Sequence, residues 1–321
     1  MLRNLLICVL VAGGYGAPAA FGQQYPSKPI RFLVPFAPGG GADLMARIVT
    51  ARMADKLGQP MVVDNRPAAS GILATELTAR AAPDGYTVLA CTSNHAGYPH
   101  MYKKLPFDIS KDFEYVTQAT ISPLVLVVHP TVPAKTMQEF IAYARNNPGK
   151  MNYGSSGPGG PPHIAGEMLK SMAKINLTHI VYKGVAPALT AALSNEVQMT
   201  FTNLFSGQPH VKGGRLRVLA VTSARRLQAA PEWPTIAESG VPGYEASIWY
   251  GFLLPAKTPK PIIDTLHREI TAVLKLPDVS QTFISQGGEV IASTPAEFQK
   301  AFLNDVERLG RVIRDAGIKA E

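Results

Sequence analysis

Apolar runs of strand length alternate with segments of helical periodicity along most of the 321-residue chain. Short apolar runs between turn residues favour strands, and apolar residues that recur every three or four positions favour helices. This pattern predicts strands at residues 30–34, 61–64, 86–91, 123–129, 177–182, 197–202, 217–222 and 248–254. It predicts helices at about residues 42–57, 71–81, 136–147, 161–173, 186–194, 260–275 and 295–316. Because alternating strands and helices build sheets covered by helices, we expect an α/β protein.

Two segments of this pattern predict burial directly. The run from Pro123 to His129 is apolar on both faces, which is typical of a strand buried inside a sheet. The last predicted helix has one apolar stripe, which indicates core packing and no further function. That stripe consists of Phe298, Phe302, Val306, Leu309 and Ile313.

Residues 1–22 have the pattern of a secretory signal peptide. Arg3 gives a short positive region, an apolar run follows from Leu5 to Ala12, and Ala20-Phe21-Gly22 is a small-residue cleavage site. The apolar run is too short to span a bilayer, and no later run reaches membrane length. We therefore expect an exported chain that is cleaved near Gly22.

The amino-acid composition favours a folded protein and argues against nucleic-acid binding. With 46% hydrophobic and 17% charged residues the chain is expected to fold, and its length allows two domains. The formal charge of +8 comes from scattered Lys and Arg that do not interleave with aromatic residues, so nucleic-acid binding is not expected. Without the leader one cysteine is left, Cys91, which cannot form an intramolecular disulfide and is expected to be buried.

The first glycine-rich loop suggests an anion site. Strand 30–34 runs into Gly39-Gly40-Gly41 and then into a helix near Ala42. The free N–H groups from Gly40 to Asp43 at this helix start favour an anion or a carboxylate. Alternatively, the Asp43 side chain caps the helix and occupies the same donors. Nucleotide binding is not expected, because Leu44 replaces the third glycine of a dinucleotide-binding motif and no P-loop motif occurs.

A second loop of the same kind, Gly154-Ser155-Ser156-Gly157, precedes a helix that opens at Pro161, where proline is favoured. Its hydroxyl and N–H groups would meet a helix start, although an ordinary tight turn has the same residues. Ser156 lacks the Gly-x-Ser-x-Gly motif of a hydrolase nucleophile, since Pro158 stands at the last glycine. His163 is interpreted as a pocket or helix-start residue rather than as a base.

Other catalytic patterns are absent from the sequence. The seven histidines have no ligand-type spacing, so no metal is expected, and these loops hold no close pair of acids for glycosidase chemistry. Short polar side chains also follow two further strands, in the segments 91–97 and 201–203. The loops offer hydrogen-bond donors without an evident base. We therefore expect binding of a ligand rather than catalysis, with no catalytic residue and no cofactor.

Eight segments resemble, in order, the signatures of the Bug receptors, the periplasmic solute-binding proteins of tripartite tricarboxylate transporters. They are YPSKPIRFLVPFAPGGGADLMAR, LGQPMVVDNRPAASG, AAPDGYTVL, YKKLPFD, GKMNYGSSG, VYKGVAPALT, LAVTSARR and PTIAESGVPGYEAS. The resemblance implies a type II periplasmic-binding-protein fold (a Venus flytrap), with two α/β lobes joined by two crossing strands. It implies lobe one at residues 25–124 plus 247–321 and lobe two at residues 125–246. The implied crossings lie in residues 123–129 and 247–254.

The resemblance also implies a ligand site between the lobes. Lobe one would contribute Phe36, Gly39, Gly40, Gly41, Ala42 and Asp43, and lobe two would contribute Ser155, Ser156, Tyr182 and Lys183. The rest of the ligand would face Ser93, Asn94, Thr202 and Asn203. Many relatives carry an acid at the position of Thr202, and such an acid can pair with an amino group, whereas threonine cannot.

The sequence as a whole predicts a non-enzymatic, monomeric periplasmic receptor. It would capture a small organic acid between its lobes and deliver the acid to the membrane subunits of a tripartite tricarboxylate-type transporter. Two alternatives stay open at this point: an orphan receptor coupled to a histidine kinase, and a secreted serine hydrolase or lyase that uses Ser156 or His163.

Overall fold

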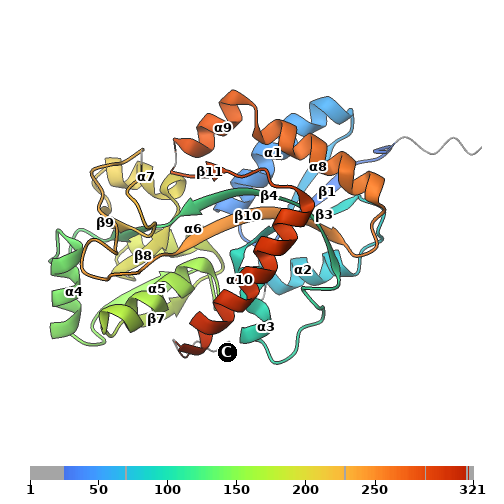
Figure 1. Cartoon of the computed structure of the whole chain (residues 1–321). Coiled ribbons are helices and arrows are strands. Elements are labelled where there is room, and N and C mark those ends of the chain that lie inside the picture. The colour runs from blue at the N-terminus through green and yellow to red at the C-terminus, as the bar shows by residue number, and fades with distance from the viewer. Residues whose placement is uncertain (1–24, 69–70, 228, 286, 316, 318–321) are drawn as a thin grey trace, which may run out of the picture.

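The computed structural model describes residues 25–68, 71–227, 229–285, 287–315 and 317. Two mixed sheets form the centres of two lobes that lie side by side (Figure 1). We call the part built on the six-stranded sheet lobe one and the part built on the five-stranded sheet lobe two. The expected signal peptide, residues 1–22, lies outside the described residues. The chain thus has the α/β architecture that the alternating pattern predicts.

The sheet of lobe one has the strand order β11-β4-β10-β3-β1-β2. Its parallel part pairs β1 with both β2 and β3, whereas β10 runs antiparallel between β3 and β4. The strands are β1 (Ile30–Val34), β2 (Met61–Asn65), β3 (Thr87–Thr92), β4 (Phe113–Pro123), β10 (Ser247–Pro255) and β11 (Glu289–Val290). Ligand loops are expected where β1 and β3 end, because both carboxyl ends lie at the same edge of the sheet.

The sheet of lobe two repeats this arrangement with the order β7-β6-β8-β5-β9. Here β6 pairs in parallel with β7 and β8, and β5 runs antiparallel between β8 and β9. The strands are β5 (Val125–Val128), β6 (Asn152–Ser155), β7 (Thr178–Val181), β8 (Met199–Thr202) and β9 (Arg217–Val221). In each lobe, therefore, one strand runs antiparallel to both of its neighbours, β10 in lobe one and β5 in lobe two.

Helices cover both sheets. They are α1 (Gly41–Leu57), α2 (Ile72–Ala79), α3 (Tyr98–Met101), α4 (Met137–Asn146), α5 (Pro161–Ala173), α6 (Val185–Leu193), α7 (Leu204–Lys212), α8 (Lys260–Leu274), α9 (Pro277–Ile284) and α10 (Pro295–Asp315), with a 3₁₀ segment, η2, at Ser93–Gly97. The predicted stripe on α10 is confirmed as core packing, since Phe298 and Phe302 are fully buried. Figure 1 shows α10 (red) running obliquely across the molecule. Near its end, Leu309 and Ile313 share an apolar cluster with Ile164 of α5.

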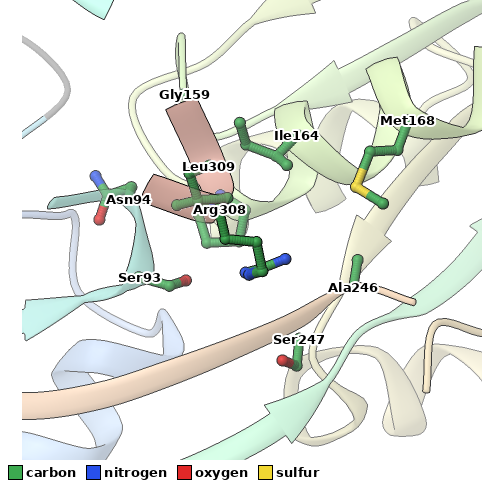
Figure 2. Close-up of a pocket in the computed structure, with 10 residues that line it drawn as sticks. Ser93, Asn94, Gly159, Ile164, Met168, Ala246, Ser247, Arg308 and Leu309 are labelled. Atoms are coloured by element: carbon green, nitrogen blue, oxygen red, sulfur yellow. The ribbon is translucent and has the colours of Figure 1, made fainter. Parts of the chain in front are cut away.

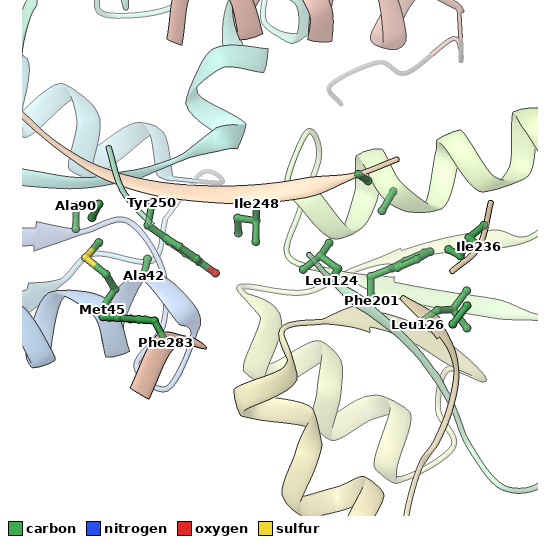
Figure 3. Packing of buried hydrophobic residues seen from close by; sticks show 14 of the residues in the cluster. Ala42, Met45, Ala90, Leu124, Leu126, Phe201, Ile236, Ile248, Tyr250 and Phe283 are labelled. Atoms are coloured by element: carbon green, nitrogen blue, oxygen red, sulfur yellow. The ribbon is translucent and has the colours of Figure 1, made fainter. Parts of the chain in front are cut away.

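Two chain crossings join the lobes. The first passes from β4 through Leu124 into β5, and the second enters β10 after Ala246. Thr222 links both, because its N–H donates to the carbonyl of Leu124 (2.9 Å) and its own carbonyl accepts from the N–H of Ala246 (2.9 Å). Figure 3 shows buried apolar side chains in both lobes, with Leu124 and Ile248 beside the crossings. The exact division of the chain at 124/125 and 246/247 stays a prediction.

The predicted strand 123–129 is wrong in one respect. It is two elements, because β4 ends at Pro123 and β5 begins at Val125, each in a different sheet. The other predicted strands and helices agree with the structure to within two residues at each end. The expected burial of Cys91 is confirmed, and burial raises the pKa of its thiol.

Candidate functional site

Three helix starts meet around one cavity. Helix α1 begins after Gly40, α5 after Gly160 and α6 after Gly184, and none of the three has a side-chain cap hydrogen bond. The first N–H groups of a helix have no partner within the helix, and its dipole makes that end partly positive. Glycine at all three caps keeps side chains away from the helix starts. Helices α1 and α6 offer free N–H groups there, whereas α5 begins with Pro161-Pro162, which have none, and contributes its dipole. This arrangement suits an anion.

The cavity, which we call the central pocket, has a volume of about 330 Å³ when the space open to solvent is included. None of its ten lining residues has a charged side chain. They are Phe36, Gly40, Gly41, Ala42, Thr92, Ser156, Pro161, Val185, Ile248 and Tyr250. The positive potential here comes from backbone N–H groups rather than from lysine or arginine. The loops after β1 and β6, which the sequence indicated as candidate sites, are therefore brought together.

Ser156 supplies a hydroxyl to this pocket. The residue is 4% exposed, and its Oγ has no hydrogen-bond partner among the described residues. A buried hydroxyl without a partner costs about 1–3 kcal/mol. Such a cost is removed when a ligand atom accepts the hydroxyl hydrogen. No histidine lies within hydrogen-bond distance of this hydroxyl, so the described residues give Ser156 no base.

The hydroxyl of Ser155, unlike that of Ser156, is hydrogen-bonded within the protein and supports the conformation of the loop. Its Oγ is 2.6 Å from Nε2 of His179 and accepts a hydrogen bond from the N–H of Gly157 (3.1 Å). The ring of His179 stacks on that of His163, with centroids 4.0 Å apart. His163 in turn accepts the N–H of Gly159 at Nδ1 (2.9 Å). Burial lowers the pKa of His163 to about 3 and that of His179 to about 4, so both rings are neutral and hold the loop.

Asp43 holds the other loop and leaves the first donors of α1 free. Its carboxylate accepts hydrogen bonds from the Gly39 N–H (2.9 Å), Arg47 Nε (3.0 Å) and Asn65 Nδ2 (3.0 Å). Burial opposes ionisation, but these hydrogen bonds outweigh it and keep the pKa of Asp43 below its usual value. The alternative in which Asp43 caps α1 is therefore wrong, because the cap residue is Gly40 and has no side-chain cap.

Tyr250 is a site residue that the sequence did not reveal. It lies on β10, lines the central pocket, and its hydroxyl is hydrogen-bonded to Asn203 of lobe two. A Cβ added at Gly41 would lie 2.0 Å from this hydroxyl, so glycine is needed for the close approach of α1. The alternation along β10 places Ile248 and Tyr250 on one face. The sequence pattern therefore indicated that Ile248 and Tyr250 lie on the same face of a strand, but it could not distinguish pocket residues from core residues.

The lobes touch on both sides of the central pocket. On one side Asn203, which caps α7 by accepting the Ser206 N–H (2.7 Å), meets Tyr250. On the other side Met101 of lobe one covers Gly159 of lobe two, where an added Cβ would lie 1.9 Å from the sulfur. The arrangement is a closed one, and a ligand in the pocket would be enclosed by both lobes.

The remaining predicted residues are divided among three neighbouring pockets. Ser93 and Asn94 line a pocket beside α10, which we call the distal pocket (Figure 2). Asn203 lines an apolar side pocket with Leu44, Met45, Phe205, Tyr250 and Phe283. Tyr182 and Lys183 line the mouth of the cleft together with Phe36 and Ser156. The predicted site residues are therefore divided between the central pocket and the three pockets next to it, and they do not gather in one pocket.

Several predicted residues point elsewhere or line no pocket described above. The hydroxyl of Tyr182 donates to Glu196 (2.8 Å), and burial together with this contact raises its pKa to about 12. Gly39 is exposed, and its carbonyl accepts from Ser206 across the lobes (3.5 Å). Thr202 is fully buried, and its Oγ1 has no partner among the described residues. Thr202 is therefore a second buried hydroxyl with its hydrogen-bonding capacity unused.

Within residues 25–68, 71–227, 229–285, 287–315 and 317, no group of three His, Cys, Asp or Glu side chains could hold a metal ion. In the same part of the chain, no helix combines the length and the apolar character that crossing a membrane requires.

Comparison with known proteins decides the family. The model of the tripartite tricarboxylate transporter family receptor, TctC, matches residues 45–318. The chain belongs to this family. It is 33% identical to the protein BugT of Bordetella pertussis, with 97% of this chain and 95% of BugT covered. Members of the TctC family are solute-binding receptors and not enzymes, and they work in the periplasm with tripartite transporters.

Two solved structures of TctC-type proteins share the fold. Rpa4515 of R. palustris with adipate has 32% sequence identity and a TM-score of 0.90, with 92% of this chain and all of that chain covered. The periplasmic binding protein BugD has 31% identity and a TM-score of 0.89 at the same coverage. The expected periplasmic-binding-protein fold is confirmed by these likenesses.

Proposed function

We propose that this TctC receptor binds a small organic acid with one carboxylate in the central pocket. Ser156 and the first N–H groups of α1 and α6 would donate to the carboxylate oxygens, and α5, which begins with two prolines, would contribute its helix dipole. The observation that carries the proposal is the meeting of three uncapped helix starts at a buried hydroxyl without a partner. The structure of Rpa4515 with adipate supports an organic acid as the ligand.

Hydrogen bonds and helix dipoles in this pocket can supply the binding free energy of a micromolar receptor. A hydrogen bond to a charged group contributes about 1.5–3 kcal/mol, and a helix dipole adds roughly 0.3–1 kcal/mol for an anion. Three such hydrogen bonds and three helix starts therefore reach the roughly −8 kcal/mol of a micromolar dissociation constant, before the costs of ordering are met. A lysine or arginine in the central pocket is not needed for this affinity.

The proposed physiological role follows from the family. The receptor acts in the periplasm as a monomer, closes on the acid, and delivers it to the membrane subunits of a tripartite tricarboxylate-type transporter. Residues 1–22 would be removed on export. Ligand release without chemical change fits a site in which Ser156 has no hydrogen-bonded base and in which burial lowers the pKa of both loop histidines, so that they are weak proton acceptors.

The test is isothermal titration calorimetry of the mature chain with a panel of mono-, di- and tricarboxylates. The Ser156→Ala variant should lose affinity for the best acid by about tenfold to a hundredfold, the equivalent of one hydrogen bond to a charged group. Ser285→Ala, which removes an exposed hydroxyl that lines none of the pockets described above, serves as the matched control. An unchanged affinity in Ser156→Ala, or no binding of any acid to the wild-type protein, would refute the proposal.

A further inference from the structure

Asn203 connects the two lobes through one side-chain amide. It follows β8 of lobe two, and its Oδ1 accepts the N–H of Ser206 at the start of α7 (2.7 Å). The other end of the amide, Nδ2, donates to the hydroxyl of Tyr250 on β10 of lobe one. Both ends of the amide are therefore engaged by the protein itself, one within lobe two and one across the lobes.

The contact between Asn203 and Tyr250 lies at the start of α1. A Cβ built at Gly41 would lie 2.0 Å from the Tyr250 hydroxyl oxygen and 3.1 Å from Nδ2 of Asn203, so both groups pack against this first residue of the helix. Gly41 and Tyr250 line both the central pocket and the apolar side pocket, whereas Asn203 lines the side pocket and not the central one. The hydrogen bond therefore lies at the boundary of the central pocket, and Asn203 reaches it from the side that faces away from the proposed carboxylate.

The burial of this hydrogen bond depends on closure of the lobes. Asn203 is 8% exposed and Tyr250 is 6% exposed, although they belong to different lobes. When the lobes separate, water replaces each partner. A second, longer contact acts in the same sense, because Oγ of Ser206 donates to the carbonyl of Gly39 (3.5 Å) in the loop before α1. The start of α7 thus meets the start of α1 in the closed arrangement.

We propose that Asn203 and Tyr250 form an interlobe latch that sets how long the ligand stays bound, through a hydrogen bond that does not involve the ligand. The proposal rests on the proposed function, in which a carboxylate in the central pocket is enclosed by both lobes. A contact made in the closed arrangement raises the closed fraction, and the apparent affinity follows the fraction of protein that is competent to hold the ligand. Asn203 is then a positioning residue and not a ligand contact.

The test is a double-mutant cycle in which surface plasmon resonance measures the rates of ligand binding to the mature chain. Tyr250→Phe removes the hydroxyl, and Asn203→Ser removes the amide donor while it keeps a favourable N-cap residue for α7. The probes are the two tightest acids of the carboxylate panel, with adipate and succinate tried first.

Each single variant should raise the dissociation rate by about twofold to tenfold, the equivalent of one neutral hydrogen bond, and should leave the association rate within about twofold. The double variant should lose no more than the weaker-binding single variant, because both substitutions remove the same hydrogen bond. The ratio of the affinities for the two acids should be the same in the wild type and in all three variants, since the latch does not touch the ligand.

Tyr244→Phe is the matched control. Tyr244 is also buried, but its hydroxyl donates to the carbonyl of Ala165 (2.8 Å) within lobe two, so its loss should leave both rates within about twofold of the wild type. Losses that add up in the double variant, or a changed ratio between the two acids, would show that Asn203 binds the ligand directly and would overturn the latch. Unchanged dissociation rates in both single variants would overturn it as well, with the proposed function intact. If the wild-type protein binds no acid of the panel, the proposed function fails and this inference with it.

Discussion

Replacement of Gly41 by alanine tests the packing that closes the central pocket. A Cβ at this position would lie 2.0 Å from the hydroxyl oxygen of Tyr250, 2.7 Å from its Cζ and 3.1 Å from Nδ2 of Asn203. Contacts this short cannot persist, so the Tyr250 ring or α1 must move. Tyr250 is 6% exposed and its ring is rigid, which leaves little room for an inexpensive shift.

The cost can be worked out from three contributions. Overpacking of a buried contact costs about 1–3 kcal/mol, and loss of the hydrogen bond between Tyr250 and Asn203 costs about 0.5–1.5 kcal/mol. Alanine in place of glycine at a helical position returns up to about 1 kcal/mol. The free energy of unfolding should therefore fall by about 0.5–4.5 kcal/mol. Ligand affinity should fall by at least about tenfold, because the first turn of α1 no longer sits against the pocket.

Gly40→Ala, one residue earlier in the same loop, is the matched control for stability. Its added Cβ would meet nothing closer than a carbonyl oxygen at 3.7 Å, and its φ of −80° suits alanine. Urea denaturation gives the free energy of unfolding for both variants, and calorimetry gives the affinity for the best acid. If Gly41→Ala is as stable as Gly40→Ala and binds with wild-type affinity, the reasoning about Tyr250 is refuted.

Three other predictions concern the loop histidines, the buried Thr202 hydroxyl and the absence of catalysis. Below about pH 6.5 the unfolded chain protonates His163 and His179, whereas the folded protein keeps them neutral, so the free energy of unfolding should be highest above this pH and decrease as the pH falls toward 4. Urea titrations at several pH values should show a smaller decrease in His179→Gln, and an identical decrease would contradict the assignment. Thr202→Val removes a buried hydroxyl without a partner and should raise the melting temperature of the ligand-free protein, by the equivalent of about 1 kcal/mol, whereas a lower melting temperature would mean that the hydroxyl is satisfied. Incubation of catalytic amounts of protein with its tightest acid should yield no product by mass spectrometry, and turnover would instead revive the hydrolase alternative.

The candidate loops were predictable because their physics is local. Glycine and proline at the end of β1 and β6 indicate open backbone and a helix start, and the structure places Gly40, Gly41 and Ser156 around one cavity. Ser155 and Ser156 have equivalent positions in the sequence motif. Only the tertiary structure separates them, since the partner that turns Ser155 away is His179 on another strand.

The rest of the site depends on distant parts of the chain. Tyr250 reads as an ordinary aromatic residue of a buried strand. It becomes a pocket residue only because β10 crosses between the lobes. Strand β4 was missed for a related reason. Its buried Thr117 and Thr120 break the apolar pattern, and Thr117 is satisfied by the carbonyl of Ser293 (2.8 Å).

A crystal structure of the mature chain with its tightest organic acid tests the central claim most directly. We expect a carboxylate in the central pocket, with its oxygens within about 3 Å of Ser156 Oγ and of the first N–H groups of α1, the distance of a charge-assisted hydrogen bond. A carboxylate bound elsewhere in the cleft, with the Ser156 hydroxyl and the helix starts facing only solvent or side chains, would contradict the account.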